Sequence, residues 1–129
     1  MTIEFSLDAG CGVSPYLQIA QQVRQAVRLG LLRAGDQLPT VKEVVSQLAI
    51  NPNTVLKAYR ELERDGLVTA RPGVGTFVTR SVPAEVTAPL EPLRRELARW
   101  LVRARSAGLD DESIAALFAT TFRAERDVA

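Results

Sequence analysis

Apolar residues in the first half of the chain repeat with the period of an α-helix. The first helical segment follows Ser14 and Pro15, which suit an N-cap and the first helical position, and Gly30 ends it. Its apolar stripe, at i, i+3, i+4, i+7 and i+11, consists of Tyr16, Ile19, Ala20, Val23 and Val27. This spacing predicts a helix that buries one face.

Two more helices are expected close together. Thr40 and Glu43 have the spacing of a capping box, and Asn51 and Pro52 suit the cap and first residue of the next helix. Gly66 suits the end of that helix. The two apolar stripes consist of Val41, Val44, Val45 and Leu48, and of Val55, Ala58, Tyr59 and Leu62. About three residues separate the helices, which is the spacing of a helix-turn-helix.

Short β-like runs surround these helices. Residues 67–70 and 76–79 flank a turn rich in Pro and Gly at 71–75, which predicts a hairpin. Leu31 and Leu32 indicate a very short strand after the first helix. In the arm at residues 1–13, the alternation of Ile3, Phe5 and Leu7 indicates another. Helix, short strand, helix-turn-helix and hairpin follow one another in the order of a winged helix.

Prolines at 83, 89 and 92 mark residues 81–92 as a linker. An amphipathic helix follows, with Arg94, Arg95, Arg99 and Arg103 on its polar face, and Asp110 caps a last helix. We therefore expect a mainly α protein with a small β-hairpin. A winged helix-turn-helix with its arm occupies residues 1–80, and a two-helix tail occupies 93–129.

Composition narrows the possible functions. The chain has no histidine and one cysteine, Cys11, which excludes Ser-His-Asp and Cys-His catalysis and histidine-containing zinc sites. We expect no enzyme, no cofactor and no metal. The apolar runs are too short to span a membrane, and the first residues lack the basic segment of a secretory signal. With 16 basic and 15 acidic residues, DNA binding requires basic residues sorted onto one face.

Several motifs resemble the GntR family of bacterial regulators. The segment Gly35-Asp36-Gln37-Leu38-Pro39-Thr40 is similar to its G-D-x-L-P-S motif, although Lys42 stands where the family usually has arginine. The run 51–63 resembles the recognition helix of the YtrA-like subfamily, and residues 66–68 and 73–78 resemble its wing. The resemblance covers about residues 14–79, and the short tail is also typical of that subfamily.

This resemblance implies a cytoplasmic, homodimeric transcription regulator, which we expect to repress by binding an inverted-repeat operator in double-stranded DNA. The expected DNA-binding residues are Thr40, Lys42, Asn51, Asn53, Thr54, Lys57, Arg71 and Gly73. Short polar side chains near the start of a recognition helix suit base edges, and the first-turn N–H groups suit a phosphate. Lys42 suits a phosphate but lacks the fork with which arginine binds guanine. Glu61, Glu63 and Asp65 interleave with Arg60 and Arg64, which predicts ion pairs on a solvated face.

The tail has more apolar surface than two helices bury alone. We therefore expect it to form the dimer through Leu93, Leu97, Trp100, Leu101, Leu117, Phe118 and Phe122. Two alternatives remain open: a winged helix that binds another protein, and a sensor with an effector pocket at the dimer interface. The sequence identifies no effector.

Overall fold

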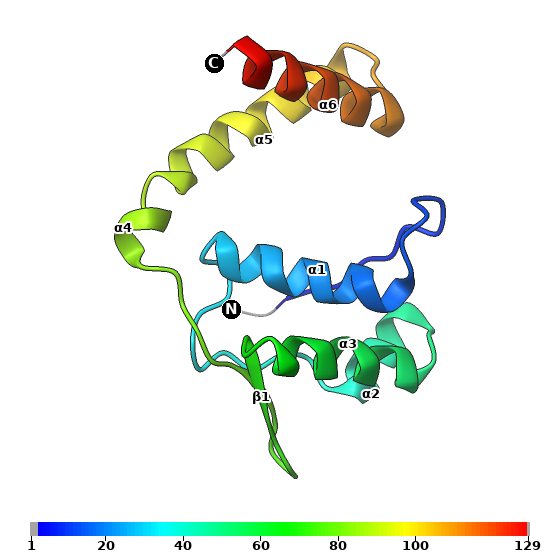
Figure 1. Ribbon diagram of the computed structural model, residues 1–129. Helices are drawn as coiled ribbons and strands as arrows, with labels where there is room; N and C mark the ends of the chain where they lie inside the picture. Colours follow the sequence, from blue (N-terminus) through cyan, green and yellow to red (C-terminus); the bar gives the residue numbers. More distant parts are fainter. Residues whose placement is uncertain (1–2, 129) are drawn as a thin grey trace. The chain divides into compact units, whose positions relative to one another are not determined.

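The computed structural model describes residues 3–128, and these form two compact units that meet between Thr87 and Ala88. The first, here called the winged-helix unit, contains α1 (Pro15–Arg28), α2 (Val41–Leu48), α3 (Pro52–Arg64), β1 (Val68–Arg71), β2 (Gly75–Val78) and α4 (Ala84–Thr87). The second, here called the tail unit, contains α5 (Leu90–Ser106) and α6 (Asp111–Val128). The expected mainly helical fold with one hairpin is confirmed (Figure 1).

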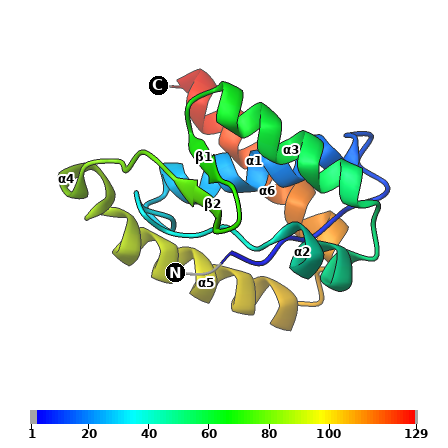
Figure 2. The ribbon, with the colours of Figure 1, turned by 90° about the horizontal axis from the view of Figure 1, so that it is seen from below.

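The helices of the winged-helix unit pack around α3. Both α1 and α2 contact α3, and the hairpin adjoins its C-terminal end, as Figures 1 and 2 show. Fifteen buried apolar residues form the core, and Ile19, Val44, Val55 and Leu62 are completely buried in it. These four completely buried residues belong to the predicted stripes of the three helices. The sequence pattern therefore identified the packing faces correctly.

The capping box of α2 and the hairpin also follow the sequence, whereas Ser14 stands at the N-cap of α1 without a side-chain cap hydrogen bond. Thr40 accepts the N–H of Glu43 at 3.1 Å, while Glu43 Oε1 accepts the N–H of Thr40 at 3.3 Å. Strands β1 and β2 pair antiparallel, with Val68 opposite Val78 and Arg71 opposite Gly75. The hairpin extends away from the helices as a wing (Figure 1).

The strand expected at Ile3, Phe5 and Leu7 is wrong. This segment has no strand partner, and its backbone instead bonds to two glutamine amides of α1. Gln22 exchanges two hydrogen bonds with the backbone of Ser6, at 3.0 and 2.6 Å, and Gln18 does the same with Asp8, at 2.8 and 3.0 Å. The amides, one helical turn apart, satisfy the arm as a neighbouring strand would.

The strand expected at Leu31 and Leu32 is also wrong. Both N–H groups donate to the carbonyl of Ala26 and so close the end of α1. The bridge to the hairpin comes five residues after Leu32, where Gln37 pairs with Phe77. In the expected linker, residues 84–87 form α4, and α5 begins at Leu90.

Candidate nucleic-acid interface

The start of α3 is fixed by its cap. Asn51 Oδ1 accepts the N–H of Asn53 at 2.8 Å, and the carbonyl of Asn51 accepts the N–H of Thr54 at 3.0 Å. Pro52 has no N–H. Of the first-turn N–H groups expected to suit a phosphate, those of Asn53 and Thr54 are therefore already engaged within the cap.

The exposed face of α3 carries polar side chains that make few hydrogen bonds with the rest of the described chain. The Asn53 side chain is exposed and makes no hydrogen bond within residues 3–128, whereas Thr54 is half-buried. Lys57, one turn further along, holds its Nζ 4.1 Å from the centroid of the Tyr16 ring. This cation–π contact positions the ammonium between the starts of α1 and α3. Tyr16, expected in the core, packs against it and also supports Lys57.

The turn before α2 is held rigidly against α3. The hydroxyl of buried Tyr59 donates to the carbonyl of Pro39 at 2.6 Å. Burial, together with the nearby charge of Glu43, raises the pKa of Tyr59 well above its ordinary value, so the donor stays protonated. Thr40 follows directly and is engaged in the capping box, while Lys42 projects from the first turn of α2 as an exposed cation.

In the wing, the Arg71 side chain is held by an aromatic ring, and the turn between the strands is tight. Arg71 lies over the ring of Phe77, with its Cζ 4.7 Å from the ring centroid. At the tip, Gly73 has φ +76°, a left-handed conformation that favours glycine. Gln37 braces the turn by donating to the carbonyl of Val74 at 3.2 Å. A Cβ at Gly75 would lie 2.3 Å from Gln37 Nε2, so a larger residue there would displace this brace, and the φ of +145° also favours glycine.

Arg60 was not among the expected DNA-binding residues, but the structure places it beside the wing. It lines a small hollow between α3 and the wing, together with Ala70 and Thr76. The ion pairs expected among residues 60–65 are wrong: Glu63 Oε2 accepts the N–H of Ala70 at 2.8 Å, and Asp65 pairs with Arg24 at 2.6 Å. The i, i+4, i+7 spacing of Asn53, Lys57 and Arg60 is the signal that places these three on one face.

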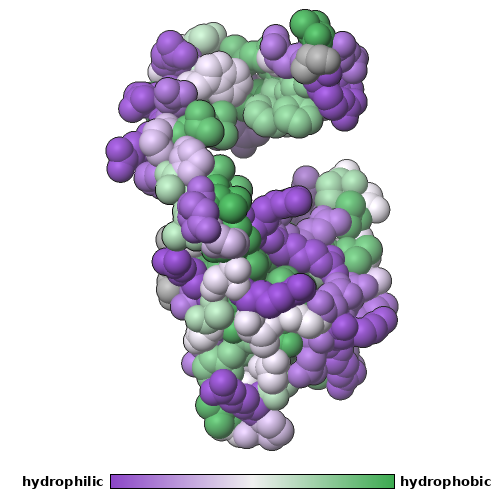
Figure 3. All heavy atoms as spheres, turned by 60° about the vertical axis from the view of Figure 1, so that its left-hand side comes forward, coloured by the Kyte–Doolittle hydropathy of each residue, from purple (hydrophilic) through white to green (hydrophobic). Residues whose placement is uncertain are grey.

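The tail unit presents an apolar surface of its own. Ala104 and Ile114 are buried between α5 and α6, whereas Leu93, Leu97, Leu117, Phe118 and Phe122 are 43–59% exposed. Figure 3 shows apolar side chains on the surface of this unit beside hydrophilic ones.

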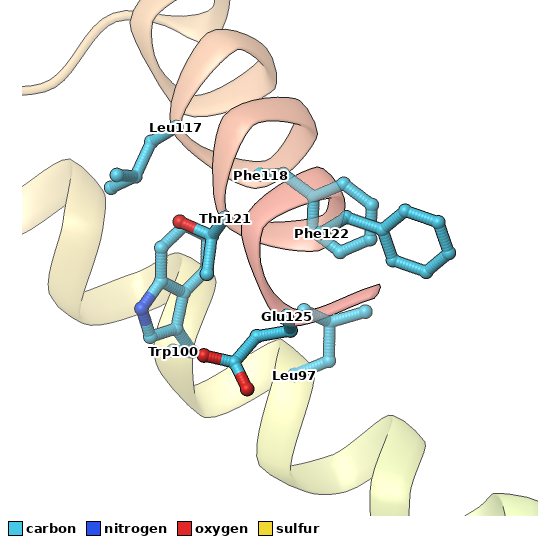
Figure 4. Close-up of a pocket in the computed structure, with 7 residues that line it drawn as sticks. All are labelled: Leu97, Trp100, Leu117, Phe118, Thr121, Phe122 and Glu125. Carbon is cyan, nitrogen blue, oxygen red and sulfur yellow. The ribbon is translucent and has the colours of Figure 1, made fainter. Parts of the chain in front are cut away.

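The two tail helices line a hollow of about 450 Å³ (Figure 4). Leu97 and Trp100 enter it from α5 and face side chains from α6. The rings of Phe118 and Phe122 stack with centroids 6.1 Å apart. Trp100 and Leu101 are half-buried. Most of the residues expected at a dimer interface thus lie on one apolar surface.

A helix-turn-helix braced by a two-stranded wing defines a winged helix-turn-helix, a class of DNA-binding domain. The model of the bacterial regulatory proteins of the gntR family matches residues 15–78. The HTH-type transcriptional repressor YtrA of Bacillus subtilis (strain 168) is 34% identical over 100 residues, which cover 77% of each chain.

Solved structures agree with this match. YtrA from Sulfolobus acidocaldarius, a GntR-family transcription factor, has a TM-score of 0.54 at 30% identity, covering 76% of this chain and 97% of that one. The structure of AraR(DBD) in complex with operator ORX1 shares the fold, with a TM-score of 0.51 at 23% identity, over 61% of this chain and 95% of that one. The chain belongs to the GntR family and is a DNA-binding transcription regulator.

Proposed function

We propose that this regulator is a cytoplasmic repressor that binds an inverted-repeat operator as a homodimer. The observation that carries the proposal is the exposed face of α3, where Asn53, Lys57 and Arg60 follow one another along the helix and Arg60 lies beside the wing. Among the described residues, no helix is both long and apolar enough to cross a bilayer. A repressor acts at promoter DNA, and bacterial promoter DNA lies in the cytoplasm.

In this proposal α3 enters the major groove. The amide of Asn53, which makes no hydrogen bond within the described residues, suits an adenine, with which asparagine forms two hydrogen bonds. Thr54 offers a methyl or hydroxyl group beside it. Asn51 positions this turn through its cap and reaches the DNA with its remaining amide group. Arg60, facing the wing, adds a guanidinium that suits a guanine or a phosphate.

The lysines supply the sequence-independent part of the affinity. Lys57 is held over Tyr16 and therefore loses little conformational freedom when it meets a phosphate. Lys42, at the start of α2, contacts the backbone on the other side of the groove, and Thr40 fixes the turn that presents it. Each phosphate contact releases counterions, so binding weakens steeply with added salt.

The wing contacts the neighbouring minor groove. Arg71 is the proposed agent, because its stacking on Phe77 holds the guanidinium at the hairpin surface. The tight turn at Gly73 lets the backbone approach the DNA closely. Gln37 keeps the tip in place from the body of the domain.

The tail unit forms the dimer. Its apolar surface is large, and burying one such side chain contributes about 1.5–3 kcal/mol. A second copy of the tail fits this surface because residues 88–129 carry seven arginines and seven acidic residues, so two copies meet without net repulsion. Two joined winged helices bind two half-sites, which raises operator affinity through effective concentration.

Selection of bound DNA from a random pool tests the proposal. The selected sites contain two inverted half-sites whose spacing reports the dimer geometry. Asn53→Ala then lowers affinity for the selected site by roughly 1–3 kcal/mol per base contact and leaves affinity for scrambled DNA unchanged.

Two further variants complete the experiment. Lys57→Ala weakens binding to both DNAs alike and lowers the salt slope by about one per contact. Gln25→Ala is the matched control, because this exposed amide on α1 makes no side-chain hydrogen bond within the described residues. Equal losses on selected and scrambled DNA for Asn53→Ala would contradict base reading.

A further inference from the structure

A hollow of about 520 Å³ lies at the C-terminal ends of α1 and α3, and the chain leading from the wing to α4 closes one side of it. It lies within the winged-helix unit and involves none of the proposed DNA-binding residues. Ser81, on this closing chain, is fastened to the body through its Oγ, which accepts the N–H of Ala34 at 2.6 Å. Thr87, at the end of α4, lies against Gly30.

Positive charge dominates the hollow. Three arginines line it, Arg24, Arg28 and Arg80, against one carboxylate, that of Asp65. Asp65 pairs with Arg24 at 2.6 Å, and its backbone carbonyl accepts a hydrogen bond from Arg80 at 3.2 Å. Arg28 makes no hydrogen bond or ion pair within residues 3–128. Two of the three guanidinium charges therefore lack a carboxylate partner in the hollow.

The rest of the wall is apolar and consists of Val27, Leu67, Val82 and Pro83. Cations are stabilised near the C-terminal ends of helices, which explains the position of Arg28 in the last turn of α1. This effect does not explain the position of Arg80, which follows β2. Guanidinium groups beside apolar walls match a ligand with a carboxylate at one end and a hydrocarbon body at the other. The volume lies within the range of small-molecule sites.

We propose that this hollow binds a small amphipathic organic acid, whose carboxylate pairs with Arg28 and Arg80 and whose apolar body packs on Val27 and Val82. Such a ligand links α1 to the segment 80–83, through which the winged-helix unit is joined to the tail unit. Binding therefore holds the segment 80–83, which leads toward the tail unit, more firmly against α1 and changes operator affinity. The binding step itself does not depend on the proposed operator or dimer.

The test uses the full chain and octanoate as the probe, followed by backbone amide NMR. Octanoate shifts the amide signals of Leu67 and Val82 saturably, whereas 1-octanol, which has the same body without the charge, binds about tenfold more weakly or not at all. Arg28→Gln weakens octanoate binding about tenfold. Arg64→Gln is the matched control, an exposed arginine in the last turn of α3 outside the hollow, and it leaves binding unchanged.

Three results would overturn the proposal. The first is the absence of saturable shifts at Leu67 and Val82, and the second is shifts confined to the apolar surface of α5 and α6. The third is Arg28→Gln protein that binds octanoate as the unaltered chain does, which would leave Arg28 with only a helix-end role. Operator titrations with and without octanoate then measure the coupling, and an unchanged operator affinity would refute that part alone.

Discussion

The two units differ in how much of their apolar surface they bury. The winged-helix unit buries fifteen apolar residues in one core, whereas the tail unit buries Ala104 and Ile114 and leaves large side chains such as Phe118 and Phe122 more than half exposed. The first unit has a hydrophobic core of its own. The second has apolar surface available for association, so its stability is expected to depend on protein concentration.

The largest expected difference concerns core truncation. Leu62→Ala removes a completely buried side chain from the first unit and lowers its free energy of unfolding by about 2–5 kcal/mol. Leu117→Ala removes a side chain of the tail unit that is 44% exposed. It changes the free energy of unfolding of the winged-helix unit by less than about 0.5 kcal/mol. The single tryptophan reports on the tail unit, and both tyrosines on the winged-helix unit. Urea unfolding followed by both signals therefore separates the effects, and equal losses would contradict the distinction.

The next effect concerns association. Leu97→Glu places a charge on the apolar surface of the tail, which removes about 1.5–3 kcal/mol of burial per copy and adds the cost of desolvating a carboxylate. Sedimentation is expected to show a monomer, and operator affinity falls while the tyrosine signal stays native.

Val102→Glu is the control for that change, because Val102 is exposed on the same helix but does not line the hollow between α5 and α6. A chain truncated after Ser81 that remains dimeric would move the interface out of the tail.

Helix caps give a smaller effect in both units. Thr40→Ala removes the capping box of α2 and costs the winged-helix unit about 1 kcal/mol. Asp110→Ala removes the acceptor of the Ser113 N–H at the start of α6 and costs the tail unit a similar amount. Each loss is expected in the unfolding signal of its own unit, and a loss shared by both signals would show that the units unfold together.

The smallest effects concern pH and have opposite signs in the two units. Burial raises the pKa of Tyr59, so its contribution is complete below the ordinary tyrosine pKa and is lost as pH rises above it. Hydrogen bonds from Ser113 lower the pKa of Asp110, so its contribution is complete above the ordinary aspartate pKa and is lost as pH falls below it. Tyr59→Phe and Asp110→Asn remove the respective pH dependence, which thermal unfolding at alkaline and acid pH measures.

The sequence predicted those features that depend on local periodicity and capping. The stripes of the three helices, the box of Thr40 and Glu43, and the cap at Asn51 all follow from spacing along the chain. Features that depend on side chains reaching across the fold were not predictable in this way. Nothing in the alternation of Ile3 and Phe5 distinguishes a strand partner from glutamine amides.

The interface shows the same division. Asn53 and Lys57 are exposed as their helical spacing predicts, whereas the pairing of Lys57 with Tyr16 joins residues far apart in sequence. The acidic neighbours of Arg60 in the sequence predicted local ion pairs rather than a contact with DNA. Glu63 bonds to the wing and Asp65 to α1, and neither forms an ion pair with Arg60.

The glutamine amides that fasten the arm to α1 have a consequence for sequence variation. Gln18 and Gln22 bond to backbone atoms of Ser6 and Asp8, so at these two positions the arm is held through its main chain, whereas Phe5 anchors it through a side chain buried in the core. Substitution at position 6 is therefore expected to be tolerated for every residue with an N–H, and proline alone is excluded, whereas at position 8 the Asp8 carboxylate also accepts the N–H of Gly10 at 3.0 Å. Among relatives that keep this arm, selection is expected to preserve the two glutamines while the exposed arm residues diverge.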